Sequence, residues 1–259
     1  MVRRSLEEGH SVVGIDRVAP PSTDHRVRAV DADVTDYAQL LEAIRGCDAL
    51  IHLAAYPSPR NHPPHEVHGN NVVGSYNALT AAVELGITRV CQASSVNAIG
   101  GVYSERPRYD YFPVDELHPT YNEDPYSLSK WVCELQGDSI VRRTPGMTIG
   151  SLRFHMVVDA DELARRAPGE DGVHARHLWG WTESGAAADA CLRVLRAGWR
   201  GHEAFYIVAP RTTASTPSAE LARMHHPDVE VRRELLGRAG FFDCGKAERL
   251  LGWVHPGGD

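Results

Sequence analysis

Short apolar runs alternate with amphipathic stretches along the first 157 residues. Helical spacing of apolar positions is often followed by glycine, a residue that ends helices. The apolar runs predict buried strands at 11–16, 27–30, 49–53, 89–93 and 148–154. The amphipathic stretches predict an N-terminal helix that ends at Gly9 and further helices at 36–45, 71–85 and 126–142. Strands that alternate with helices indicate a doubly wound α/β fold, in which a parallel sheet is covered on both faces.

The pattern is less regular in the second part of the chain. Residues 160–172 are charged and loop-like, whereas the spacing predicts helices at 185–197 and 217–224 and a strand at 203–208. We therefore expect two units. A Rossmann-like nucleotide-binding domain spans residues 1–157, and a small substrate lobe, interleaved with it, spans residues 158–259.

Composition narrows the class of ligand. The chain has 259 residues, with 27 Lys+Arg against 34 Asp+Glu, a formal net charge of −7 and no long basic run. This balance argues against nucleic acid or an anionic membrane as the main partner and favours a small molecule. No apolar stretch approaches the roughly 18 residues of a membrane helix, and no signal peptide is evident. Five dispersed cysteines predict a reducing, cytoplasmic location without disulfides.

Fourteen histidines raise the question of a metal site. His62, His65 and His68 are evenly spaced, but Pro63-Pro64 should break a helix there, so we expect no metal. The tryptophans Trp179, Trp181 and Trp199 are expected in the core of the lobe.

In a doubly wound sheet, ligands bind beyond the carboxyl ends of the strands. Asp16 ends the first strand, where a carboxylate can accept hydrogen bonds from the adenosine ribose and repel a 2′-phosphate. Arg17 could instead pair with that phosphate, so the choice between NAD and NADP stays open. Asp33 could accept from the adenine amino group. A turn or a helix cap would explain such carboxylates equally well.

Tyr126 and Lys130 lie four residues apart, on one face of a predicted helix, and Ser94-Ser95 ends the strand before it. A phenol with a pKa near 10 is a poor base at neutral pH. A neighbouring ammonium favours the phenolate, and a serine hydroxyl can orient a substrate oxygen. The Tyr and Lys spacing also occurs by chance, so the pair alone is a weak signal.

Together these segments resemble the extended short-chain dehydrogenase/reductases, the NAD-dependent epimerase/dehydratase group. The resemblance extends to the C-terminal segment 243–253. The matching motifs, in order, are Asp16, Asp33-Val34, His52-Leu53-Ala54-Ala55, Asn71-Val72-Val73-Gly74-Ser75, Ser94-Ser95-Val96-Asn97-Ala98-Ile99-Gly100 and Tyr126-Ser127-Leu128-Ser129-Lys130.

The resemblance implies roles. Tyr126 would be the general acid/base, Lys130 would hold the nicotinamide ribose and lower the pKa of Tyr126, and Ser95 would hydrogen-bond the reacting oxygen. The hydride chemistry would belong to NAD, with NADP still open. Asn71 would support the active-site helix. The resemblance implies further cofactor contacts from Asp16, Arg17, Asp33, Val34, Leu53, Ala54, Ala55 and Phe154, and substrate contacts from Val96, Asn97 and His155.

Two segments depart from this family pattern. The Gly-rich turn T-G-x-x-G-x-x-G and the central strand before it are missing, a difference of roughly 15–20 residues. We therefore expect a gap in the sheet between the strands at 11–16 and 49–53, and either a start at an internal methionine or a true truncation. Gly185 and Ala186 replace an Arg-Asp pair of the family, which weakens the case for a nucleotide-sugar phosphate contact.

The leading hypothesis is an NAD(P)-dependent oxidoreductase that acts on a sugar or sugar-acid hydroxyl, because the chain is short for a nucleotide-sugar enzyme. Epimerisation or dehydration of a nucleotide sugar is the alternative within the family. The alternative from another class is a truncated, non-catalytic Rossmann-like binding protein. The resemblance also implies a homodimer that pairs the helices at 71–85 and 126–142.

Overall fold

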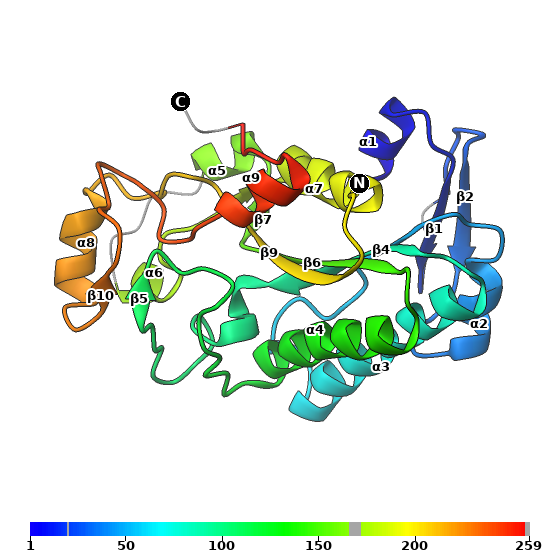
Figure 1. Ribbon diagram of the computed structural model, residues 1–259, viewed down its shortest axis with the longest axis horizontal. Coiled ribbons are helices and arrows are strands. Elements are labelled where there is room, and N and C mark those ends of the chain that lie inside the picture. Colours follow the sequence, from blue (N-terminus) through cyan, green and yellow to red (C-terminus); the bar gives the residue numbers. More distant parts are fainter. Residues whose placement is uncertain (20, 166–171, 257–259) are drawn as a thin grey trace.

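A four-stranded parallel sheet forms the centre of the computed structural model, which describes residues 1–19, 21–165 and 172–256. Helices α3 and α4 cover one face, and helices α7 and α9 cover the other (Figure 1). This is the doubly wound arrangement that the sequence predicts. The strands, in their order across the sheet, are β3 (Leu50–His52), β4 (Arg89–Ser95), β6 (Thr148–Phe154) and β9 (Gly201–Ile207).

Apolar side chains on both faces of the sheet hold the layers together. Ile149 and Val90 pack on the side of α3 (Pro64–Glu84) and α4 (Pro125–Arg143). Leu152 and Phe205 pack on the side of α7 (Ser184–Arg196) and α9 (Gly245–Leu251). Apolar side chains on both faces of these strands give the segments their apolar character, although buried polar residues such as Gln92 and Arg153 also lie in them.

The sheet is split at the point where the sequence predicts a missing strand. β1 (Val12–Asp16) and β2 (Val27–Asp31) form a separate parallel pair, and within the described residues β1 has no hydrogen-bonded partner in the central sheet. Helix α1 (Val2–Glu7) joins this pair to α7 through an Arg4–Asp189 contact of 3.4 Å. Helix α2 (Tyr37–Ala43) follows β2, as the pattern predicts.

A second layer of short elements lies beside the central sheet, at the end of the molecule that carries α8 in Figure 1. Trp179, Phe112 and Phe241 form its core, so the prediction for Trp179 is confirmed. Trp199 instead packs beside Phe205 of the central sheet. The elements at this end are β5 (Tyr111–Phe112), α6 (Gly172–Arg176), α8 (Ser218–His225) and β10 (Glu230–Val231). The short strands β7 (Val157–Val158) and β8 (Thr182–Glu183) contact α7, and helix α5 (Ala160–Arg165) follows β7.

Two local predictions are wrong. The helix predicted at 71–85 begins two turns earlier, because Pro64 occupies its first position, where a missing N–H costs nothing. His65 and His68 therefore lie inside a helix. The start of the segment predicted as a loop at 160–172 is helical, as α5, while residues 166–171 lie outside the described part.

Candidate functional site

Three predicted catalytic side chains come together where β4 ends and α4 begins. Asp124 caps α4, accepting hydrogen bonds from the backbone N–H of Tyr126 at 3.0 Å and of Ser127 at 2.9 Å. This cap and Pro125 start the helix so that Tyr126 lies in its first turn, beside the end of β4. The side chains of Ser95 and Tyr126 lie within hydrogen-bonding reach, and this contact lowers the pKa of the Tyr126 phenol.

Lys130 lies one helical turn after Tyr126. Its Nζ donates to the carbonyl oxygen of Ala93 at 2.8 Å and is 5.8 Å from the centre of the Tyr126 ring. Ser95 Oγ also accepts from the backbone N–H of Asn97 at 3.1 Å, at the start of the short helix η1 (Val96–Ile99). The sequence therefore predicted a real cluster of a serine, a phenol and an ammonium.

Burial sets the electrostatics of this cluster. Tyr126 is buried, which raises the pKa of its phenol, while the hydrogen bond from Ser95 lowers that pKa. Burial lowers the pKa of Lys130, and Cys133 and Glu134 act against this shift. A hydrogen-bond donor and a cationic side chain thus lie next to a phenol, an arrangement suited to moving a proton at the Tyr126 oxygen.

Asn71 connects the segment after β3 to the helix that carries Tyr126. Its Oδ1 accepts from the backbone N–H of Tyr56 at 2.8 Å, and its Nδ2 donates to the Tyr56 carbonyl at 3.1 Å and to Ser129 Oγ at 3.0 Å. Leu53 and Ala54, in the intervening segment, are exposed, and Ala55 is partly buried. The contact of these three residues with the cofactor stays a prediction.

The residues predicted to hold adenosine lie on the separate β1–β2 pair. Asp16 is exposed at the end of β1, and Arg17 donates to the hydroxyl of Tyr56 at 3.3 Å. Asp33 Oδ1 accepts from the backbone N–H of Thr35 at 2.8 Å, which makes it a turn carboxylate. Hydrogen bonds from the hydroxyl and from the backbone N–H of Thr35 lower the pKa of Asp33.

Val34 packs tightly on helix α3. A Cβ built on Gly74 would lie 2.7 Å from the Cγ2 atom of Val34, so glycine is required there for the close approach. The Val34 carbonyl accepts from Asn77 at 3.0 Å. The side chain of Val34 therefore serves packing on α3.

The predicted substrate residues have different environments. Asn97 is buried beside Ser95, with its Nδ2 3.3 Å from Ser95 Oγ. Val96 belongs to the hydrophobic cluster around Trp179, so its side chain faces the core. His155 donates from Nε2 to the carbonyl of His177 at 2.8 Å, and burial lowers its pKa to about 4. The ring of His155 is therefore neutral at pH 7.

Phe154 ends β6 directly beside Ser95, its register partner on β4. Its side chain is partly buried against the apolar cluster that includes Leu152 and Phe205. The position next to Ser95 agrees with the predicted place near the reacting groups. The packing shows that one face of the ring serves the core.

The fit to NAD differs between the two ends of the site. Lys130 has three N–H groups and gives one to Ala93, so two remain for ribose hydroxyls. Tyr126 and Ser95 lie beside it. In contrast, the described residues form no Gly-rich turn before a helix whose backbone N–H groups could hold a pyrophosphate. The residues present fit the nicotinamide end of the cofactor.

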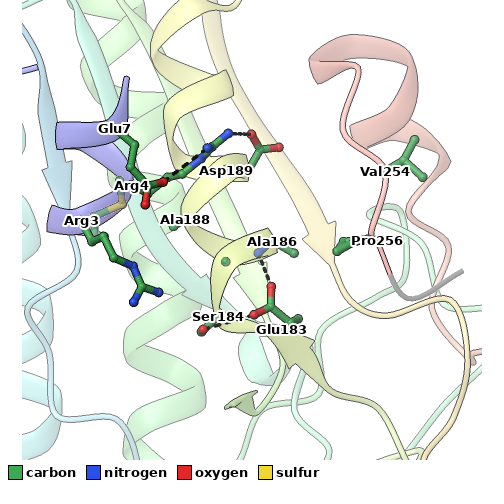
Figure 2. A pocket seen from close by; sticks show the side chains of 12 residues that line it. Arg3, Arg4, Glu7, Glu183, Ser184, Ala186, Ala188, Asp189, Val254 and Pro256 are labelled. Atoms are coloured by element: carbon green, nitrogen blue, oxygen red, sulfur yellow. Dashed lines mark hydrogen bonds and ion pairs between the residues drawn. The ribbon is translucent and has the colours of Figure 1, made fainter. Parts of the chain in front are cut away.

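A pocket of about 730 Å³ lies away from this cluster, between α1, the start of α7 and the C-terminal segment (Figure 2). Arg3 and Arg4 line it together with Glu7, Glu183 and Asp189, so its charges are mixed. None of its lining residues is a predicted site residue. Glu183 accepts from the backbone N–H of Ala186 at 2.6 Å and so caps α7.

Two neighbours of the cluster were not predicted. The ring of Tyr103 meets the ring of Tyr126 edge to face, with centroids 5.8 Å apart, and the guanidinium carbon of Arg60 lies 5.7 Å from the centre of the Tyr103 ring. Both come from irregular segments without periodicity, so no sequence signal could place them.

Two kinds of structure are absent from the described residues 1–19, 21–165 and 172–256. These residues contain no group of three or more His, Cys, Asp or Glu arranged to hold a metal ion. They also form no helix with the length and apolar character needed to cross a membrane.

Comparison with known proteins gives the family. The model of the NAD dependent epimerase/dehydratase family matches residues 1–163. Cinnamoyl-CoA reductase 1 of Petunia hybrida is 34% identical over 143 residues, which cover 51% of this chain and 41% of the reductase. L-arabinose 1-dehydrogenase (NAD(P)(+)) of Haloferax volcanii is 31% identical over 168 residues, which cover 60% of this chain and 65% of that enzyme. The chain thus spans about half the length of such curated relatives.

A solved structure supports the fold over nearly the whole chain. A short-chain dehydrogenase/reductase superfamily protein from Agrobacterium tumefaciens, with bound NAD, superimposes with a TM-score of 0.72 at 21% identity. The match covers 98% of this chain and 88% of that protein. The architecture, the ordered motifs and the family match lead to one conclusion: the chain belongs to the NAD-dependent epimerase/dehydratase family.

Proposed function

We propose that this protein is an NAD(P)-dependent oxidoreductase that transfers a hydride between a sugar or sugar-acid hydroxyl and the cofactor. The observation that carries the proposal is the contact of the Ser95 hydroxyl with the Tyr126 phenol, one helical turn from the buried Lys130. These three groups are what proton transfer at a hydroxyl needs.

In the oxidation direction, the phenolate of Tyr126 takes the proton of the substrate hydroxyl as the carbon beside it gives up its hydride. The hydroxyl of Ser95 orients the substrate oxygen. Lys130, held by the Ala93 carbonyl, keeps a positive charge near the phenolate and would hold the nicotinamide ribose. When bound, NAD accepts the hydride. In the reduction direction, Tyr126 returns its proton to the carbonyl oxygen.

Replacement of Tyr126 tests the proposal. Tyr126→Phe keeps the ring contacts but removes the acid/base, and we expect kcat for sugar oxidation to fall by about 10²–10⁴-fold. Tyr103→Phe is the matched control, because it removes a neighbouring phenol and keeps the edge-to-face contact; its kcat should stay within about threefold. An equal effect of the two substitutions on NADH formation would contradict the assignment of Tyr126.

Cofactor choice is tested by binding. We propose NAD as the principal cofactor, because Asp16 at the end of β1 repels a 2′-phosphate. Arg17 is engaged with Tyr56 rather than free for a phosphate. Titration calorimetry should show NAD binding more tightly than NADP, and Asp16→Ala should reduce the difference. An unchanged preference in Asp16→Ala would contradict the role of Asp16.

The family's epimerase/dehydratase chemistry is the second candidate. It starts from the same oxidation but returns the hydride, so a nucleotide sugar would be converted without net formation of NADH. Product analysis by chromatography, run beside the NADH assay, separates the two activities. A third reading is a non-catalytic binding protein. Absence of NAD binding by calorimetry would favour that reading over both enzymes.

We also propose a homodimer formed by α3 and α4. Val73 and Tyr76 on α3 and Leu128 and Leu135 on α4 are large apolar side chains with more than two-fifths of their surface exposed. Exposed apolar patches of this kind mark interaction surfaces. Sedimentation should show a dimer that Leu135→Glu dissociates, whereas Leu236→Glu, at an exposed site elsewhere, should leave it intact. A monomeric wild-type protein would contradict the proposal.

Two broader expectations remain proposals. The five cysteines are described and all carry free thiols, which supports the reducing cytoplasm. We retain the division at residues 157 and 158, with the cluster around Trp179 as the core of the substrate lobe. β9 lies after this boundary in the chain and pairs with β6 of the central sheet, which supports the interleaved arrangement.

A further inference from the structure

A buried ion pair lies one helical turn beyond Lys130. Glu134 of α4 accepts from Arg153 of β6 at two points, from Nε to Oε1 at 2.9 Å and from Nη2 to Oε2 at 2.8 Å. Both side chains are at most 4% exposed. The hydroxyl of Ser94 donates to the same Oε1 atom at 2.5 Å, and Arg153 Nη1 lies 3.3 Å from the hydroxyl of Tyr206.

The pair connects the helix to a row of residues across the sheet. Ser94 and Arg153 are register partners on β4 and β6, and Arg153 and Tyr206 are register partners on β6 and β9. The carboxylate of Glu134 thus contacts two neighbouring strands directly and is linked to a third. This row lies one residue before Ser95, the last residue of β4.

Three consecutive residues at the end of β4 meet three residues of α4 spaced four apart. In order along the strand, the carbonyl of Ala93 accepts from Lys130, the hydroxyl of Ser94 donates to Glu134, and the hydroxyl of Ser95 hydrogen-bonds Tyr126. The first and third contacts belong to the proposed reaction. The second does not touch the reacting groups, and Arg153 reinforces it through a two-point contact with the same carboxylate.

We propose that Glu134 and Arg153 are positioning residues, which fix α4 along β4 so that Tyr126 and Lys130 meet Ser95. This inference rests on the proposed function of those three residues. The forked geometry explains the choice of an ion pair. Apolar contacts are non-directional and let a helix slide, whereas a two-point guanidinium–carboxylate contact holds both partners in one orientation.

The charge of Glu134 also favours the required form of Lys130. Burial lowers the pKa of Lys130, and the nearby Cys133 and Glu134 act in the opposite direction. A buried pair of this kind is by itself weak evidence for stability, because removing two charges from water is costly. Holding α4 in one orientation is a role that the pair can have without any gain in stability.

The test compares two positions on the same helix face. Glu134→Gln keeps the shape of the side chain and removes the charge. Asp138→Asn is the control, since Asp138 lies one turn farther from Tyr126 and hydrogen-bonds His202 of β9 at 2.8 Å. A misplacement of about 1 Å can cost 10²-fold in rate, so we expect kcat to fall by about 10- to 100-fold in Glu134→Gln. KM for the sugar should change by less than about threefold, because Glu134 touches no substrate, and Asp138→Asn should keep kcat within about twofold.

Two further measurements keep the inference testable if Glu134→Gln folds poorly or the wild-type enzyme shows no turnover. Arg153→Lys keeps the charge and loses the fork, and it should show an intermediate loss of kcat. Amide hydrogen exchange should speed up at residues 93–97 and 125–131 in both variants and stay at wild-type rates there in Asp138→Asn. Equal exchange in all three variants, or equal kcat losses in Glu134→Gln and Asp138→Asn, would overturn the positioning role. Lack of wild-type turnover would contradict only the proposed function.

Discussion

Lys130→Met should shift the pH dependence of the reaction. The sequence contains only two lysines, Lys130 and Lys246, so the buried ammonium beside Tyr126 is easily isolated. Its Nζ lies 5.8 Å from the centre of the Tyr126 ring. If the phenolate charge is taken as centred on the ring, an effective dielectric constant of about 20 gives an attraction of ~3 kcal/mol between it and the ammonium at that distance. This energy corresponds to ~2 pKa units.

Loss of the positive charge disfavours the phenolate, so the pKa of Tyr126 should rise. The rate of oxidation depends on the deprotonated form, and the rising limb of kcat against pH should therefore move upward by ~2 pH units. At pH 7 the expected loss is about 100-fold. Initial rates of NADH formation at saturating NAD, measured from pH 6 to pH 10, separate this effect from weaker cofactor binding.

Two controls complete the experiment. Lys130→Arg keeps the charge, so the rising limb of its kcat against pH should remain close to that of the wild type. Lys246→Met removes the other lysine, which pairs with Glu203 at 2.8 Å, and should leave the limb unchanged. A limb at the wild-type pH in Lys130→Met would refute the electrostatic argument, even if kcat fell.

Three further predictions concern the free energy of unfolding. Asp124→Ala removes the cap of α4 and should lower the free energy of unfolding by ~1 kcal/mol, while Asp124→Asn should retain most of it; equal losses in chemical denaturation would contradict capping. Asn71→Ala leaves the backbone of Tyr56 without its partners and should cost about 1–3 kcal/mol in the same assay, more than Asn70→Ala. Burial lowers the pKa of His155 from 6.5 to about 4, so the unfolded state takes up its proton first as the pH falls. Stability should therefore be full above pH 6.5 and decline by ~1.4 kcal/mol per pH unit down to about pH 4, and His155→Gln should show a smaller decline; an unchanged slope would refute this assignment.

Much of the fold and the catalytic cluster followed from local sequence signals. The strand at 148–154 was predicted with its observed bounds, because Ile149, Leu152 and Phe154 give it the apolar character of a buried strand. Tyr126 and Lys130 were placed on one helix face by their spacing alone, since that spacing is a property of the helix itself. The gap between β1 and β3, in contrast, was expected from the resemblance to the family, whose pattern has one more strand at that place.

Contacts between distant segments depended on the tertiary structure. Arg153 reads as a charged residue within an apolar strand, and only the packing of α4 on β4 and β6 brings Glu134 to it. Val96 was predicted to contact substrate, but its side chain joins the cluster around Trp179. Tyr103 lies in a stretch without periodicity, so its approach to Tyr126 has no local signal.

The sequence by itself thus determined the helices, the strands and the residue types that carry the proposed chemistry, because periodicity, caps and spacing are local. The tertiary structure decided which of these residues meet. It joins Ser95, Tyr126 and Lys130 at the end of β4, and it leaves Asp16 on a separate pair of strands. The physical reason is that contacts across a fold depend on how layers pack and register, which no single segment encodes.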